Sequence, residues 1–86
     1  MREIEILLVT ADNCHFCAHA QEALARVAER HPLSVSEIAW TSGEGRRLTE
    51  RDGVLFPPGS YLDGRFFGYG RLSGGKINKW PRERQA

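Results

Sequence analysis

The sequence predicts an α/β fold with a four-stranded mixed sheet, and three features point to it. The nearly continuous apolar run Ile4–Val9 is typical of a central strand covered by helices on both faces. Helically spaced apolar residues follow this run, and the partly alternating segment Leu33–Trp40 then predicts a second, parallel strand. Asp63-Gly64, flanked by apolar residues, is the signal for a tight antiparallel hairpin. The predicted element order is β-α-β-α-β-β-α.

The first helix is expected over Ala18–Arg30, directly after a pair of cysteines. Asp12 or Asn13 is a candidate N-cap, because short polar side chains accept hydrogen bonds from the first turn. His31-Pro32 ends the helix, since the residue before a proline is disfavoured in helical geometry. The apolar stripe expected to face the sheet consists of Cys17, Ala20, Ala23, Leu24, Val27 and Ala28.

The middle of the chain predicts an edge strand followed by a short polar helix. Leu33–Trp40 has fewer apolar residues than the first strand, which favours a position nearer the sheet edge. Thr41–Glu44 offers a capping hydroxyl followed by an acid, a pattern that precedes helices. A helix is therefore expected over Arg46–Arg51, ending at Gly53.

The last third predicts a hairpin and a final helix. Gly59–Leu62 and Arg65–Phe67 are its strands, and alternation places one of the two phenylalanines in the core and the other on the opposite face. We expect the last helix, capped by Ser73 and running through Trp80, to cover that opposite face. Residues 81–86 are expected to be a frayed tail.

Length and charge restrict the class of protein. The 86 residues suit a single domain spanning 1–86, and the formal net charge is +1. The C-terminal third is basic but lacks the interleaved aromatic residues of a nucleic-acid groove, so we expect no nucleic-acid partner. Ile4–Val9 is too short for a signal-peptide core or a membrane span. We therefore expect a cytoplasmic monomer with no membrane partner.

The only two cysteines, Cys14 and Cys17, lie at the predicted strand-to-helix junction. A Cys-x-x-Cys pair in a βαβ unit is the signature of a dithiol redox site. Two intervening residues in the first helical turn bring the sulfurs within disulfide distance. The unpaired N–H groups of that turn also favour a thiolate. The spacing therefore predicts a redox-active pair.

Other roles for the pair remain open. A structural disulfide would close a very small ring, and such bonds are rare in the cytoplasm. A zinc site needs further ligands, and His15, His19 and His31 do not repeat a metal-ligand spacing. We assign no metal ligand, although metal binding and inert buried cysteines stay as alternatives.

Over essentially its whole length the chain resembles the glutaredoxin branch of the thioredoxin superfamily. The resemblance rests on the element order, on Cys14-His15-Phe16-Cys17, and on Pro58, which precedes Asp63-Gly64 by the family's gap of four residues. It implies a thioredoxin-like fold, dithiol–disulfide oxidoreductase activity without a bound organic cofactor, and a cis-proline at Pro58 beside the disulfide.

At two places this chain differs from the pattern of glutaredoxins that use glutathione. Family members that use glutathione have a basic residue where this chain has Ala11, and an acidic residue in the stretch that here is Gly68–Leu72. The arginine in this stretch, Arg71, cannot accept hydrogen bonds from the γ-glutamyl ammonium group. The substitutions argue against the usual mode of glutathione binding, so glutathione is doubtful as co-substrate.

The resemblance implies roles for named residues. Cys14 would be the attacking thiolate and Cys17 the resolving thiol, acting on a disulfide-bearing protein or a small thiol substrate. The candidate substrate-binding residues are His15, Phe16, Pro57, Pro58, Tyr69 and Arg71. His19 is expected to be an ordinary residue of the helix surface. Two alternatives are an iron–sulfur or soft-metal site shared through Cys14 by two domains, and a redox-inert binding adaptor.

Overall fold

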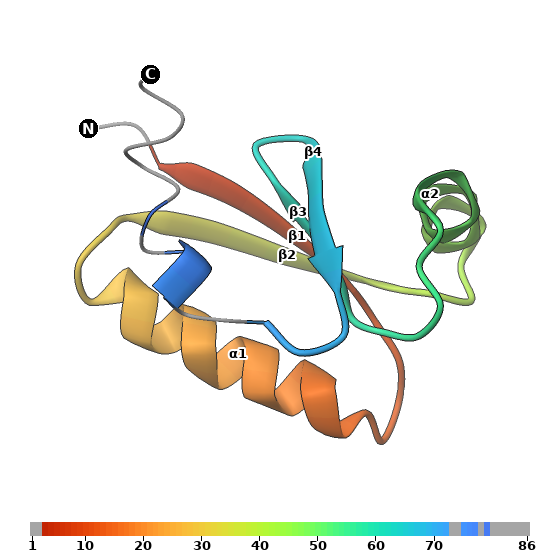
Figure 1. Cartoon of the computed structure of the whole chain (residues 1–86), viewed down its shortest axis with the longest axis horizontal. Coiled ribbons are helices and arrows are strands. Elements are labelled where there is room, and N and C mark those ends of the chain that lie inside the picture. The colour runs from red at the N-terminus through yellow and green to blue at the C-terminus, as the bar shows by residue number, and fades with distance from the viewer. Residues whose placement is uncertain (1–2, 73–74, 78, 80–86) are drawn as a thin grey trace.

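The protein is built on a four-stranded sheet with the strand order β2-β1-β3-β4 (Figure 1). The computed structural model describes residues 3–72, 75–77 and 79. Strand β1 pairs in parallel with β2 and antiparallel with β3, and β3 pairs antiparallel with β4. The elements are β1 (Ile4–Thr10), α1 (His15–Ala28), β2 (Leu33–Ala39), α2 (Gly43–Asp52), β3 (Gly59–Leu62) and β4 (Arg65–Tyr69). The predicted mixed sheet, with β1 inside it and β2 at an edge, is confirmed.

The hydrophobic core lies between one face of the sheet and α1 (Figure 1). Alternate residues of β1 point to this face, as the period of two in a strand requires. The described residues at 75–77 and 79 are helical, and they add Ile77 to the same core. The buried cluster comprises Ile4, Ile6, Leu8, Ala20, Leu24, Val27, Leu62, Leu72 and Ile77. In the described part of the chain, no helix is long and apolar enough to cross a membrane.

The start of α1 differs from the prediction. The helix begins at His15, and its N-cap is Cys14 rather than Asp12 or Asn13. The Cys14 sulfur accepts the hydrogen bond that a polar oxygen supplies in most caps. The helix also ends earlier, at Ala28, which is exposed and lies outside the buried stripe.

The ends of α2 and the hairpin follow their local signals. Ser42 is the N-cap of α2, and Gly53 ends the helix in left-handed geometry with a φ of 68°. Asp63 and Gly64 both have positive φ, 52° and 81°, as a type I′ turn requires. The capping hydroxyl predicted in Thr41–Glu44 is that of Ser42, and the helix begins directly after it at Gly43, three residues earlier than predicted.

The described part of the final helix lies on the other side of the sheet from the side that the sequence predicts. Phe67 packs against the core, whereas Phe66 is exposed on the other face and contacts the ring of Tyr61. Ile77 belongs to the same core as α1, so the described part of the last helix covers the Phe67 face and not the Phe66 face. The predicted cap Ser73, the residue Trp80 and the tail 81–86 lie outside the described residues.

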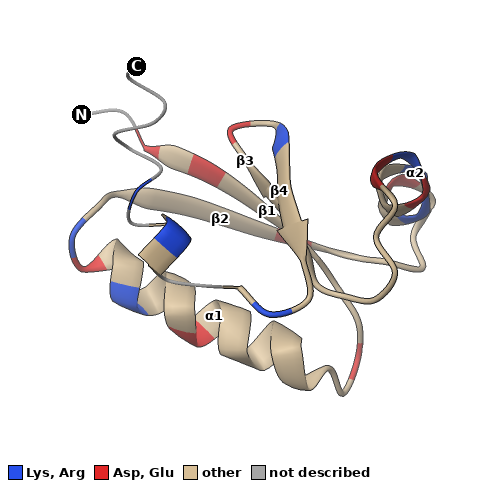
Figure 2. Ribbon diagram, in the orientation of Figure 1, with Lys and Arg blue, Asp and Glu red and all other residues tan. Residues whose placement is uncertain are grey.

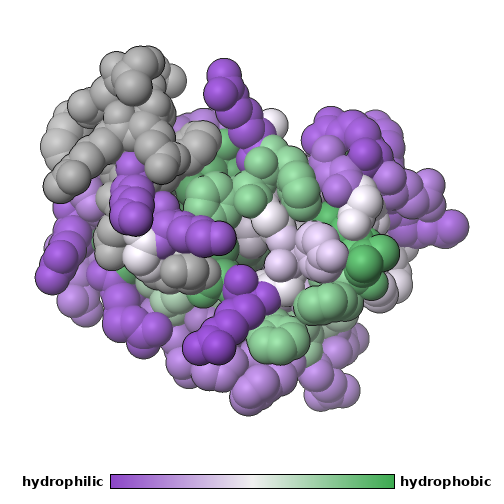
Figure 3. Space-filling model, in the orientation of Figure 1, coloured by the Kyte–Doolittle hydropathy of each residue, from purple (hydrophilic) through white to green (hydrophobic). Residues whose placement is uncertain are grey.

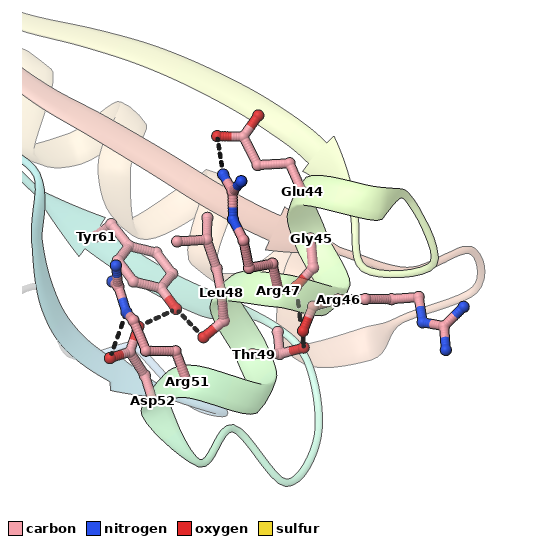
Figure 4. A network of polar contacts seen from close by, with 9 residues as sticks. All are labelled: Glu44, Gly45, Arg46, Arg47, Leu48, Thr49, Arg51, Asp52 and Tyr61. Atoms are coloured by element: carbon pink, nitrogen blue, oxygen red, sulfur yellow. Dashed lines mark hydrogen bonds and ion pairs between the residues drawn. The ribbon is translucent and has the colours of Figure 1, made fainter.

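The second face of the sheet is covered by α2 at one end (Figure 4). The Tyr61 hydroxyl reaches from β3 to α2 and donates to the carbonyl of Leu48 and the carboxylate of Asp52. Beside this contact a hollow of about 380 Å³ remains between Glu5, Ser36 and α2. The sequence predicts that helices cover both faces of β1. The face toward α1 is fully covered, and the face toward α2 is only partly covered.

Gly45 allows α2 to lie close to the end of β2, and this contact can be tested by adding a methyl group. A Cβ at Gly45 would overlap the carbonyl oxygen of Ala39, which is backbone and cannot rotate away. We expect Gly45→Ala to lower the free energy of unfolding by about 2 kcal/mol or more, measured by urea denaturation. Gly43→Ala adds the same methyl group to the same helix in open space, and should change stability by less than about 0.5 kcal/mol. Equal effects of the two substitutions would contradict the close packing.

Candidate functional site

The two cysteines are placed by the turn that joins β1 to α1. Asn13 adopts a positive φ of 55°, a conformation that asparagine tolerates better than most residues. The chain then enters α1 with Cys14 as N-cap and Cys17 in the first turn, and the two residues form a disulfide with a Cα–Cα distance of 5.1 Å. Cys17 is buried and Cys14 is half-buried. Cys14 is therefore the cysteine that an incoming molecule can reach.

The first turn of α1 provides one backbone hydrogen-bond donor to the Cys14 sulfur and one to the Cys14 carbonyl. The backbone N–H of Cys17 donates to Cys14 Sγ at 3.1 Å, and the N–H of Ala18 donates to the Cys14 carbonyl at 3.2 Å. The first turn contains no acidic residue. Donors and the positive end of the helix dipole both favour negative charge on a sulfur at this position.

The Pro57-Pro58 segment lies against the disulfide although it is 43 residues further along the chain. The peptide bond between the two prolines is cis. The Pro57 carbonyl oxygen lies 3.8 Å from Cys14 Sγ, where a reduced Cys14 thiol can donate a hydrogen bond to it. The Pro58 carbonyl accepts from the N–H of Gly70 at 2.8 Å, which ties the end of β4 to this segment.

Three exposed rings lie side by side, Phe16 between the two cysteines, Phe56 directly before Pro57 and Tyr69 at the end of β4, and we name them the aromatic rim. Phe56 is the central ring, with its centroid 6.0 Å from that of Phe16 and 5.2 Å from that of Tyr69. Each ring is between 37% and 45% exposed. The adjacent Leu55 is 74% exposed and extends this apolar surface, which Figure 3 shows between the start of α1 and the segment before β3.

Gly70 leaves space for the central ring of the aromatic rim. Its φ of 74° is in the left-handed region, and a Cβ there would lie 2.7 Å from Cε2 of Phe56. A side chain at position 70 would thus displace Phe56 as well as strain the backbone. The glycine that hydrogen-bonds to Pro58 therefore also sets the position of Phe56.

A polar hollow of about 580 Å³ lies on the other side of the cysteines. It is lined by the β1–α1 turn, by both cysteines, and by Gln21 and Glu37. The Gln21 side-chain amide donates to both carboxylate oxygens of Glu37, at 3.1 and 3.0 Å. The first half of α1, His15–Gln21, carries no Lys, Arg, Asp or Glu (Figure 2).

His15 and His19 lie one helical turn apart on the exposed surface of α1. Their Nε2 atoms are 3.1 Å apart, and their rings are nearly perpendicular with centroids 4.6 Å apart. The ring of His15 also lies at 6.3 Å from that of Phe16. The residue after Cys14 is therefore paired with a second histidine that the sequence prediction left without a role.

Comparison with known proteins gives a fold but no family. No protein-family model matches the chain, and no curated protein sequence matches it. Among solved structures, a protein of unknown function from Staphylococcus aureus is similar with a TM-score of 0.63 and 15% identity, over 99% of this chain and 94% of that one. A thioredoxin from Thermus thermophilus is similar with a TM-score of 0.55 and 18% identity, over 98% of this chain and 75% of that one.

The chain has a thioredoxin-like fold. The cysteine pair with its two-residue spacing lies at the start of α1 in this fold. At these identities the likeness is one of architecture.

Within the thioredoxin-like fold, most of the predicted site residues are brought together. Cys14, Cys17 and Pro57 are in contact around the disulfide. Arg71 is exposed and directly follows Gly70, whose N–H donates to the Pro58 carbonyl. The sequence prediction missed Phe56, which lies two residues before Pro58, the proline expected beside the disulfide.

A separate polar cluster on the second sheet face fixes α2 and does not touch the cysteines (Figure 4). Arg51 donates to the Asp52 carboxylate at 2.8 Å, and the buried Tyr61 hydroxyl donates to the same carboxylate at 2.8 Å. The Arg51 hydrogen bond, aided by that of Tyr61, holds the pKa of Asp52 below its usual value. Burial, together with the neighbouring carboxylate, raises the pKa of Tyr61.

The lowered pKa of Asp52 predicts how stability depends on pH. A carboxyl group whose pKa is lower in the folded state stabilises the fold above its unfolded pKa, near 4, and loses this contribution as the pH falls through its folded pKa. We expect the free energy of unfolding of the wild type to exceed that of Asp52→Asn at neutral pH, and the difference to shrink below about pH 4. This difference in free energy of unfolding is measured by denaturant unfolding between about pH 2 and about pH 7, a range that extends to both sides of the usual pKa of an aspartate.

Glu50→Gln serves as the control for this experiment, because it removes the same charge from an exposed position of α2. A constant difference between wild type and Asp52→Asn over the whole pH range would contradict the linkage.

Proposed function

We propose that the protein is a dithiol–disulfide oxidoreductase with Cys14 as nucleophile and Cys17 as resolving thiol. The observation that carries the proposal is the placement of the pair. The half-buried Cys14 sulfur lies at the N-terminus of α1, accepts a hydrogen bond from a backbone N–H, and is bonded to the buried Cys17. The thioredoxin-like fold supports it. A reducing compartment such as the cytoplasm would return the pair to the dithiol form between cycles.

The proposed reaction consists of two thiol–disulfide exchanges. The Cys14 thiolate attacks one sulfur of a substrate disulfide, which forms a mixed disulfide and releases the other substrate sulfur as a thiolate that takes up a proton. The Cys17 thiol then loses its proton and attacks Cys14 Sγ, which forms the Cys14–Cys17 disulfide and releases the second substrate thiol. The substrate gains two electrons and two protons, and a thiol reductant resets the enzyme.

The proposed substrate is a disulfide in a polypeptide rather than glutathione. Ala11 and Arg71 replace the groups with which similar glutaredoxins hold the two ends of glutathione. In their place the site presents the aromatic rim, which suits apolar side chains next to a substrate cysteine. No organic cofactor is part of the proposal, and the protein is proposed to act as a monomer.

The backbone beside the disulfide also favours recognition through side chains. Proline has no N–H, so Pro57 can offer an extended substrate its carbonyl oxygen but no donor. The Pro58 carbonyl already accepts from Gly70. A substrate therefore finds few backbone partners here, and apolar contact with the aromatic rim is proposed to supply most of the binding energy.

Variants of the two cysteines test the chemistry. We expect Cys14 in the reduced protein to react with iodoacetamide with a midpoint below about pH 8.5, the value for a free cysteine. Cys14→Ser should abolish disulfide reduction. Cys17→Ser should accumulate a mixed disulfide with the substrate, detected by mass spectrometry, because no thiol remains to resolve it. A pair that forms no reversible disulfide in a glutathione redox buffer would refute the proposal.

The aromatic rim can be tested separately from the chemistry. We expect Phe56→Ser to reduce kcat/KM for a peptide disulfide flanked by apolar residues by about tenfold, since about 1.4 kcal/mol of apolar contact is lost. The kcat/KM for a small disulfide such as hydroxyethyl disulfide should change less than about twofold, because this substrate is too small to contact the aromatic rim. Val35→Ser is the matched control, because Val35 has the same 45% exposure on β2. Equal losses on both substrates would exclude the rim as a binding surface.

A further inference from the structure

A second chemical feature of α1 is the pair of histidine rings beside the disulfide. We propose that His15 and His19 form a binding site for a divalent transition-metal ion, with Cu²⁺ as the preferred ion. Neither residue has a part in the thiol exchange proposed above. The site is accessible, because both side chains belong to exposed residues.

The distance between the two imidazole nitrogens fits two ligands of one metal. The Nε2 atoms are 3.1 Å apart. With metal–nitrogen bonds of about 2.0–2.1 Å, this separation corresponds to an N–metal–N angle of about 95–100°. That angle is close to the right angle between neighbouring ligands of tetragonal Cu²⁺, and below the tetrahedral angle. In the ring-to-ring hydrogen bond one Nε2 carries a proton, so metal binding requires that this neutral ring change to the tautomer protonated at Nδ1. A small rotation then directs both Nε2 lone pairs to a common point.

The helix holds the two ligands at this separation without help from a loop. Residues i and i+4 are neighbours on a helix surface, so the rings of His15 and His19 start from adjacent Cβ positions. This end of α1 is fixed by the Cys14–Cys17 disulfide and by the N–H of Ala18 bonded to the Cys14 carbonyl. Little backbone conformational entropy therefore remains to be lost when a metal binds.

The site offers two protein ligands and leaves the remaining positions to water. Among the described residues, no group of three or more His, Cys, Asp and Glu is arranged to hold a metal. A two-imidazole site with open water positions favours ions that bind nitrogen strongly, and Cu²⁺ leads the divalent series. In the oxidised protein both sulfurs are in the disulfide, so the proposed site needs no thiolate and is independent of the redox proposal.

Titration of the oxidised protein with Cu²⁺ tests the inference. We expect one ion per chain, with nitrogen hyperfine coupling from imidazole in the electron paramagnetic resonance spectrum. His15→Ala and His19→Ala should each weaken binding by at least about tenfold, because each leaves a single imidazole. Zn²⁺ should bind more weakly than Cu²⁺. Circular dichroism and a thiol assay on each variant verify that α1 and the disulfide are intact.

His31→Ala is the matched control, since it removes the third histidine of the chain from a position beyond the end of α1. It should leave Cu²⁺ binding unchanged. The same affinity in the wild type, His15→Ala and His19→Ala would place the ion elsewhere, for example at the terminal amine, and would overturn the proposal. Binding retained in the Cys14→Ser/Cys17→Ser double variant supports a site made of imidazoles, and binding lost there refutes it.

Discussion

The hydrogen bond from the Cys17 N–H to the Cys14 sulfur connects the fold to its chemistry. A helix N-terminus needs an acceptor for its free N–H groups, and here the acceptor is the atom proposed to react. The sulfur can accept this bond in the disulfide and as a thiolate, so a change of redox state does not remove the cap. The same hydrogen bond therefore stabilises the start of α1 and would stabilise the Cys14 thiolate.

The pairing of β1 with β3 brings the second half of the site to this sulfur. Val9, near the end of β1, is opposite Gly59, the first residue of β3. The chain before β3 must consequently pass close to the turn that follows β1, and this places Pro57 beside Cys14. The Gly70–Pro58 hydrogen bond then adds the end of β4. Sheet register, rather than any local sequence signal, thus assembles residues from three parts of the chain.

The features that the sequence predicted well are those decided by a few neighbouring residues. Gly53 and the Asp63-Gly64 turn require positive φ, which few residues tolerate, so their roles were apparent in the sequence. The core stripe of α1 followed from helical spacing, except for Ala28, which is exposed. The predicted N-cap of α1 was wrong, because N-cap preferences favour side chains with an oxygen acceptor and the acceptor here is a sulfur. The last helix was assigned to the wrong face, because alternation shows that Phe66 and Phe67 face opposite sides but not which side the helix covers.

Contacts between side chains that are distant in sequence were beyond prediction, and they determine what the site can recognise. Phe56 meets Phe16 and Tyr69 because three separate segments converge, and Gly70 leaves the space for its ring. Backbone recognition needs a donor and an acceptor at fixed positions, whereas an apolar rim tolerates many side chains. Because Pro57 lacks a donor and the Pro58 carbonyl is already bonded, substrate selection under the proposed function would depend on the aromatic rim. The substrates proposed for such a surface are therefore a range of apolar polypeptide segments and not one small polar thiol.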